Sequence, residues 1–461
     1  MLNKVSFTKL VIEGLPLSII LIGVAFVSFS LGPYQTYDTQ MEFEAASNVL
    51  RMGIPFVKVF GTVIDQPPLG FYTEAAFFRI FGLSTNTGVA LVTLFGLGSV
   101  ALLYVIGKRF YGKSTGLLAA ALFGLNPWQV VLSRSFLIDS QCLFLSLLCL
   151  YIGILAINKV SVKLTLVAGL VFAAAVLTKF FAVFVLIPLL LFYIYSRPKR
   201  TKQVLSQLAA FFIPALVFSL FWYQVFLGRS LFSIFDNNNV TSVIPASTHV
   251  VPSPFFVTNF LLNYGVGLYF LVAAAFSLVL VLSLKRYFSK VVIVDLICLA
   301  TIAFILSVNF VMGAVFKLNV PYFSAIKYDF QALPFLVLLV GSLITKSLAT
   351  FRAAKSTVHL KKHMLYLVAA SAVILFAASL ISSMFYTNAL STRDYLQYRV
   401  EPQVNYGYAL STTTPLTASS SLITFQYLGF AVVLSGLLLG LLWTCRHKLQ
   451  RLFKRENVQK T

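Results

Sequence analysis

The sequence predicts an all-α polytopic membrane protein with about twelve transmembrane helices. Of the 461 residues, 59% are hydrophobic and only 10% are charged, and the mean hydropathy is +0.91. A water-soluble core cannot bury that much apolar surface. The apolar residues also form unbroken runs of about 20 residues, which is the length of a membrane-spanning helix. A β-barrel would instead show short segments of alternating polarity.

A window of about 19 residues places the predicted spans along the chain. The fifth and sixth spans are separated only by Lys179, and the first contains Glu13. We interpret the first as an uncleaved span because no small-residue cleavage site follows it. The predicted spans lie near residues 10–32, 86–106, 114–132, 136–157, 164–178, 180–196, 204–227, 265–284, 291–312, 329–345, 364–386 and 421–443.

The distribution of charge predicts the orientation of these spans. With the N terminus in the cytoplasm, inner segments hold 25 of the 35 Lys and Arg residues, and outer segments hold 10 of the 13 Asp and Glu residues. The positive-inside rule describes this partition. We therefore expect a multi-pass protein of the cell (plasma) membrane with both termini in the cytoplasm. The net charge of +22 follows from short basic loops and does not indicate nucleic-acid binding.

The long connections fall on the predicted extracytoplasmic side, at residues 33–85, 228–264, 313–328 and 387–420. The first of them contains a predicted amphipathic helix from Thr39 to Met52. Thr39 is its expected N-cap, and Glu42 is the expected capping-box partner. The apolar stripe of this helix is expected to face the membrane and consists of Met41, Ala45, Val49 and Met52.

Two further features of this first loop suggest a site at the membrane surface. Asp38 directly precedes the amphipathic helix, although a solvated loop acid is an alternative interpretation. Pro67 and Pro68 then predict the start of a second interfacial helix, just after Asp65 and Gln66. The aromatic residues of this second helix are expected at headgroup depth: Phe71, Tyr72, Phe77, Phe78 and Phe81.

Other charged groups sit at the outer ends of predicted spans. They are Arg134 and Asp139 in SRSFLIDSQ, Lys179 in LTKFF, and Lys327, Tyr328 and Asp329 in KYDFQALP. A charge against hydrocarbon is costly unless it is paired, snorkels to the interface or is functional. Pairing of Arg134 with Asp139 is one structural explanation. As a ring at one membrane depth, these groups would suit a lipid-linked phosphate and a proton transfer.

Five segments together resemble the GT-C superfamily of polyprenyl-phosphate-dependent glycosyltransferases. The resemblance is to glycosyltransferase family 39 and its relatives, the protein O-mannosyltransferases and the lipid A aminoarabinose transferase. It covers residues 1 to about 345 in the family's order. The segments are the first outer loop with Asp38, DQPPLGFY, SRSFLIDSQ, GLVFAAAVLTKFF and KYDFQALPFL.

The resemblance implies an inverting transfer of a sugar from a polyprenyl-phosphate donor to a protein, lipid or glycan acceptor. Asp38 is the implied catalytic acid that activates the acceptor, and Asp139 matches the family's second acidic position. The implied ligands of the donor phosphate are Arg134, Lys179 and Lys327. The residues expected to support the site are Glu42, Asp65, Gln66 and Tyr328. No metal site is assigned, and a divalent cation stays open as a cofactor because some relatives hold one near the position of Asp65.

By the same resemblance, residues 1–345 form the GT-C-like transmembrane catalytic region. Residues 346–461 form a C-terminal transmembrane region with the outer loop 387–420 and a basic cytoplasmic tail. The alternative function is a twelve-span secondary transporter, which would place charges or broken helices at mid-membrane. A non-enzymatic assembly protein is a third interpretation. Nucleotide-binding motifs such as a Walker loop are not found in the sequence.

Overall fold

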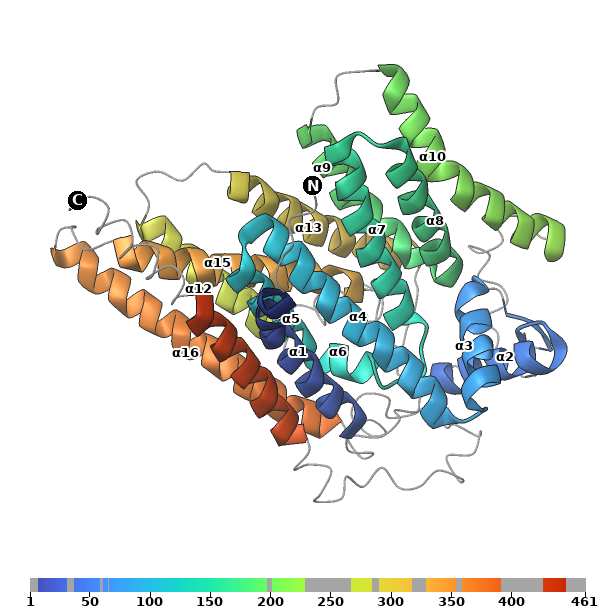
Figure 1. Ribbon diagram of the computed structural model, residues 1–461, viewed down its shortest axis with the longest axis horizontal. Coiled ribbons are helices and arrows are strands. Elements are labelled where there is room, and N and C mark those ends of the chain that lie inside the picture. The colour runs from blue at the N-terminus through green and yellow to red at the C-terminus, as the bar shows by residue number, and fades with distance from the viewer. Residues whose placement is uncertain are drawn as a thin grey trace.

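The computed structural model describes residues 7–30, 37–58, 61–64, 66–196, 201–228, 267–283, 290–316, 329–353, 359–390 and 426–444. These residues form a bundle of long helices, with two shorter helices beyond one end of it (Figure 1). Six helical segments are long and apolar enough to cross a membrane, and four shorter apolar helices accompany them among the described residues. The all-α polytopic fold is therefore confirmed.

Each of the twelve predicted spans overlaps at least one described helix. The first six correspond to α1 (Phe7–Ser30), α4 (Thr85–Tyr111), α5 (Lys113–Gly124) with α6 (Pro127–Leu132), α7 (Asp139–Lys159), α8 (Val162–Thr178), and the 3-10 helix η1 (Phe180–Val185) with α9 (Leu186–Ser196). The next five correspond to α10 (Thr201–Leu220) with the π-helix η2 (Phe221–Phe226), α12 (Gly267–Ser283), α13 (Lys290–Phe316), the 3-10 helix η5 (Phe330–Ala332) with α15 (Leu333–Ala353), and α16 (His359–Leu390). The last is the C-terminal helix Gln426–Thr444.

One predicted span is wrong in its continuity. Residues 114–132 form two helices, because the first helix ends at Gly124 and the second begins at Pro127. Asn126 caps α6 by accepting a hydrogen bond from the backbone N–H of Trp128 at 3.0 Å, and Pro127 occupies the first helical position. A proline has no N–H with which to continue a preceding helix. A hydropathy window does not register this, so it predicts one span where the backbone forms two helices.

Helices α2 (Tyr37–Met52) and α3 (Leu69–Phe81) make up most of the first connection, with a short antiparallel hairpin between them. The hairpin strands are β1 (Phe56–Val57) and β2 (Thr62–Val63), and Phe56 pairs with Val63. Figure 1 shows α2 and α3 beside the end of the bundle where α4 begins. Pro68 directly precedes α3, as the double proline predicted.

A second, smaller core holds α2 and α3 against the bundle. Ala45 and Val49 of α2 are buried with Phe71 and Phe78 of α3 and with Phe136, which precedes α7. The expectation that the α2 stripe faces the membrane is therefore wrong for its central residues, which face protein. The second expectation for α2 is also wrong, since the helix begins at Tyr37 and Thr39 lies inside its first turn instead of capping it.

The opposite end of the bundle joins different helices through polar contacts. Lys346 of α15 forms an ion pair with Asp295 of α13, and the same ammonium lies over the Tyr111 ring at the end of α4. Thr115 of α5 bonds to Thr345 of α15 at 2.8 Å. The end of α4, the beginning of α13 and the end of α15 therefore meet at one end, as alternating spans require.

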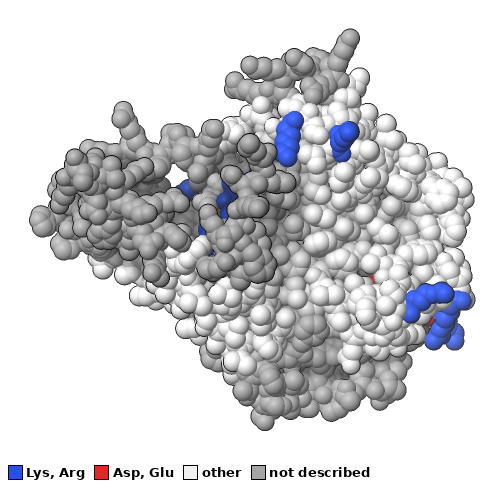
Figure 2. Space-filling model, in the orientation of Figure 1, with Lys and Arg blue, Asp and Glu red and all other residues white. Residues whose placement is uncertain are grey.

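The described surface of one face carries few charges. Figure 2 shows a broad uncharged area, with cations at one edge beside the tip of the α2–hairpin region. Exposed Arg51 and Lys58 belong to that region. Further cations lie at another edge of this face. Lys159 and Lys163, at the end of α7 and the start of α8, are also exposed. An apolar belt between charged edges suits a bilayer.

Glycines allow α1 and the C-terminal helix to pack closely. A Cβ on Gly429 would lie 2.7 Å from a methyl carbon of Val27 and 2.8 Å from the carbonyl oxygen of Gly23. Backbones can approach this closely only where side chains are small, as in many membrane helix pairs. Figure 1 shows these first and last helices side by side.

We predict that Gly429→Ala lowers the thermal unfolding temperature in detergent, because overpacking of this kind costs about 1–3 kcal/mol. Gly14→Ala is the matched control, since Gly14 is also in a described helix and a Cβ there would meet nothing within 4 Å. An unfolding temperature of Gly429→Ala equal to that of the control would contradict this packing.

Candidate functional site

The N-terminal end of α7 carries a buried ion pair. The Lys179 ammonium lies 2.7 Å from a carboxylate oxygen of Asp139, the first residue of α7. Asp139 is only 3% exposed, whereas the Lys179 side chain is 14% exposed. The lysine thus keeps part of its surface open while it neutralises a buried acid. A positive helix N-terminus adds to the attraction for anions here.

The backbone around Lys179 explains how a lysine reaches this position. Helix α8 ends at Thr178, Lys179 itself is extended with φ −161° and ψ 138°, and η1 starts at Phe180. This single extended residue separates two apolar helices, as the predicted spans 164–178 and 180–196 require. The extended residue allows the side chain to point across to α7 instead of along α8.

Gln141 links three helices beside the ion pair. Its amide nitrogen donates to the Thr73 hydroxyl of α3 at 3.1 Å and to the Thr178 hydroxyl of α8 at 3.4 Å. Gln141 lies two residues after Asp139, on the first turn of α7. The amide therefore fixes α3 and the end of α8 relative to the helix that carries Asp139.

Glu42 connects α2 to the same end of α7. One of its carboxylate oxygens accepts a hydrogen bond from the backbone N–H of Ile138 at 2.9 Å, and Glu42 is 1% exposed. Ile138 directly precedes Asp139. The expected capping-box role of Glu42 is thus replaced by a contact 96 residues along the chain.

Glu74 of α3 is a second buried acid near Glu42. It is 2% exposed, and its Oε2 atom makes no hydrogen bond within the described part of the chain. Burial, and then the nearby charge of Glu42, raise the pKa of Glu74 well above its ordinary value of 4.5. The protonated form of Glu74 therefore stabilises the fold. That contribution is full at pH values below 4.5 and is lost as pH rises through the raised pKa.

A further polar group lies where α13 and α15 approach α7. The Asn309 amide of α13 donates to the Asp329 carboxylate at 2.7 Å, and Asp329 is fully buried. Two residues later, the Gln331 amide contacts the Cys142 sulfur of α7 at 3.6 Å. The chain that follows KYD in the sequence is therefore packed against the helix of Asp139.

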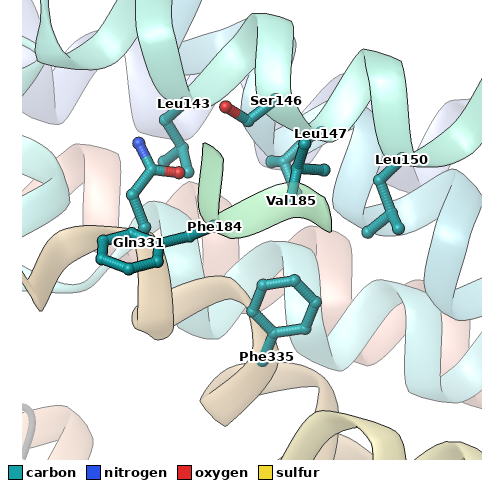
Figure 3. Close-up of a pocket in the computed structure, with 8 residues that line it drawn as sticks. All are labelled: Leu143, Ser146, Leu147, Leu150, Phe184, Val185, Gln331 and Phe335. Atoms are coloured by element: carbon teal, nitrogen blue, oxygen red, sulfur yellow. The ribbon is translucent and has the colours of Figure 1, made fainter. Parts of the chain in front are cut away.

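A small cavity lies beside Gln331, between α7, η1 and α15. Figure 3 shows Gln331 and Ser146 as its polar lining residues, and apolar side chains line the rest. It has room for about one water molecule, which is far too small for a sugar. The other lining residues are Leu143, Leu147, Leu150, Phe184, Val185 and Phe335.

The structure brings several of the sequence-predicted residues together. Asp139, Lys179 and Glu42 meet around the start of α7, and Arg134 is fully buried in the connection just before that helix. The alternative pairing of Arg134 with Asp139 is wrong, because the ion pair of Asp139 among the described residues is with Lys179. Gln66 precedes α3 and is half-buried.

Other predicted residues lie partly or wholly outside the part of the chain that the structure describes. Asp38 occupies the second position of α2, and its side chain falls outside what the structure describes. Asp65, Lys327 and Tyr328 lie outside the described residues altogether. Among the residues that are described, no group of three His, Cys, Asp or Glu side chains converges as metal ligands.

The sequence interpretation missed Glu74, Thr73 and Gln141 as site neighbours. The sequence could have indicated Gln141, because it belongs to the same SRSFLIDSQ segment as Asp139. For Glu74 the sequence shows only that an acidic residue lies within a predicted interfacial helix.

Comparison with known proteins finds a matching family model and solved structures of similar fold. The family model described as dolichyl-phosphate-mannose-protein mannosyltransferase matches residues 65–223, which include Arg134, Asp139 and Lys179. ArnT from Cupriavidus metallidurans, bound to undecaprenyl phosphate, superimposes with a TM-score of 0.52 at 16% identity, over 91% of this chain and 76% of ArnT. These matches support the resemblance of the chain to the GT-C superfamily. The predicted family resemblance is thereby confirmed.

Further proteins are similar to parts of this chain. The apo oligosaccharyltransferase of Archaeoglobus fulgidus has a TM-score of 0.52 at 16% identity, over 84% of this chain and 56% of the archaeal one. Two putative mannosyltransferases of Bacillus subtilis strain 168, YkcB and YycA, are each 29% identical over 34% of this chain. The match spans only 22% of YkcB and 23% of YycA.

Proposed function

We propose that this protein is a GT-C membrane glycosyltransferase that takes a sugar from a polyprenyl-phosphate donor. The observation that carries the proposal is the buried, partly open Lys179–Asp139 pair at the N-terminal end of α7. It lies within the segment that matches the mannosyltransferase family model. The ArnT structure of the same fold, which holds undecaprenyl phosphate, supports a lipid-linked phosphate as the ligand.

The proposed reaction is an inverting displacement at the sugar C1. An acceptor hydroxyl or amine attacks C1, the C1–O bond to phosphate breaks, and polyprenyl phosphate leaves with the bonding electrons. The proton of the acceptor passes to the Asp38 carboxylate, which acts as the general base. Charge therefore grows on the phosphate during transfer, and cations fixed near it lower the barrier.

Three cations are proposed to receive that charge. Lys179 is already held in place by Asp139, and the fully buried Arg134 lies in the connection before α7. Lys327 follows from the family resemblance, and so does the supporting role of Tyr328, Asp65 and Gln66. Whether a divalent cation takes part is left to experiment, with Asp65 as its first candidate ligand.

We place this site on the extracytoplasmic side, with both termini in the cytoplasm. The described contacts support alternating spans, with Lys346 at the end opposite to Asp139. Lys108 and Arg109 in the last turn of α4, and Lys113 at the start of α5, lie at that opposite end. An end rich in cations suits the cytoplasmic side of a plasma membrane.

A secondary transporter is less well supported by the described helices. A transporter site would place ionisable groups at broken helices near the middle of the bilayer. The break between α5 and α6 is capped by Asn126, which is uncharged. The two described ion pairs instead join helix ends, at opposite ends of the bundle.

The deciding experiment incubates the purified protein with a panel of polyprenyl-phosphate sugars and with nucleotide sugars. Mannose is the first sugar to try, because the matching Bacillus proteins are named putative mannosyltransferases. We expect consumption of at least one lipid-linked sugar and of no nucleotide sugar. Turnover of nucleotide sugars alone, or of none of the compounds by folded protein, would reject the proposal.

A further inference from the structure

The position of Glu42 relates α2 to the start of α7. Glu42 lies one helical turn after Asp38 in α2, so residues 38 and 42 are neighbours on that helix. Its carboxylate holds the N–H of Ile138, the residue before Asp139. A single side chain thus sets the distance between the turn that carries Asp38 and the residue that anchors Lys179.

Glu74 makes the contact between Glu42 and Ile138 depend on protonation. Glu42 and Glu74 are both almost fully buried, on helices that pack against each other. Two ionised carboxylates in such a setting repel each other strongly, and one proton removes the repulsion. The Ile138 N–H favours the charged form of Glu42, because an N–H donates to a carboxylate. Glu74, whose Oε2 has no hydrogen bond, is the natural carrier of the proton.

The charged groups of neighbouring elements do not alter this assignment. Helices α4 and α8 also contact α3, but Lys108 and Arg109 of α4 lie in its last turn, at the far end. Lys163 lies at the start of α8, at the opposite end of that helix from Thr178 and the site. Asp139 and Lys179 neutralise each other. Glu42 is thus the described charge that acts on Glu74.

We propose that Glu42 is a positioning residue for glycosyl transfer, and that Glu74 keeps one proton on the pair so that Glu42 can hold α7. The inference rests on the proposed function for its link to catalysis. The structural role of Glu42 and Glu74 can be tested without measuring any activity. Loss of the shared proton at alkaline pH would place two negative charges between α2 and α3 and loosen the Ile138 contact.

The first test measures hydrogen exchange of the full-length protein in detergent, without substrate. We expect peptides that contain Ile138 to exchange at least tenfold faster in Glu42→Ala than in wild type. Glu42→Gln should restore most of the protection, because its amide oxygen accepts the same hydrogen bond. Glu44→Gln is the matched control on α2, since Glu44 instead accepts from the Lys58 N–H at 3.1 Å. Unchanged exchange in Glu42→Ala would overturn the proposal.

The second test measures pH profiles. Wild-type thermal stability and transfer should both decline on the alkaline side, and Glu74→Gln, which mimics the protonated acid, should move both declines to higher pH. Identical alkaline limbs in wild type and Glu74→Gln would overturn proton sharing. If wild type consumes no lipid-linked sugar, the proposed function fails, while the exchange and stability profiles still decide the role of the pair. If wild type is active, Glu42→Ala should lower kcat about tenfold or more with the donor KM little changed.

Discussion

Asp38→Asn is expected to reduce transfer from a lipid-linked sugar by a factor of about 10²–10⁴, the usual contribution of a general base. Asparagine keeps the size of the side chain but cannot take the acceptor proton. Asp38 lies in the first turn of α2, and the Glu42–Ile138 contact holds that helix against the start of α7. We therefore expect kcat to fall while the protein remains folded. Initial rates with the donor found in the panel measure the effect.

The control for Asp38 is a change on the same helix that leaves the proposed base intact. Glu44→Gln serves, because Glu44 bonds to the hairpin and is not part of the proposed reaction. Unfolding temperatures of both variants should match wild type within a few degrees. Near-wild-type turnover by Asp38→Asn would remove Asp38 from the mechanism and leave the fold assignment untouched.

The sequence was a good guide to the spans because hydropathy is a local property. Each predicted span overlaps a described helix, and even the short pair separated by Lys179 was placed correctly. The break at Asn126 was missed because neither it nor Pro127 lowers the hydropathy of the window enough. The alternation of spans then placed Asp139, Lys179 and Asp329 at one end. The Lys179–Asp139 ion pair and the contact of Gln331, two residues after Asp329, with Cys142 agree with this.

Partners of buried groups were harder to predict than helices. An apolar stripe looks the same whether it faces lipid or another helix, so Ala45 and Val49 were assigned to the wrong neighbour. The alternative explanation for Asp139 considered Arg134, a cation near it in sequence, whereas its partner Lys179 is 40 residues away. The Glu42 contact to Ile138 involves a backbone N–H, which no side-chain pattern reveals. Long-range contacts of this kind follow from the fold alone.

Lys179→Met is expected to affect both transfer and stability. Loss of a fixed charge at a developing anion lowers rates by a factor of about 10²–10³. The phosphate is charged both in the bound donor and during transfer. We therefore expect the donor KM to rise and kcat to fall. The substitution also leaves Asp139 buried without its ion-pair partner, at 3% exposure. Breaking a buried pair in this way destabilises by about 3–5 kcal/mol.

A second substitution separates these two effects of Lys179. In the double variant Lys179→Met with Asp139→Asn, the buried charge is gone, so most of the lost stability should return. Transfer should not return, because the double variant still lacks the cation for the phosphate. If Lys179 only held the structure together, the double variant would regain activity along with its unfolding temperature. Recovery of stability without recovery of rate would instead assign the lysine to the donor, and Asp139 to holding it there.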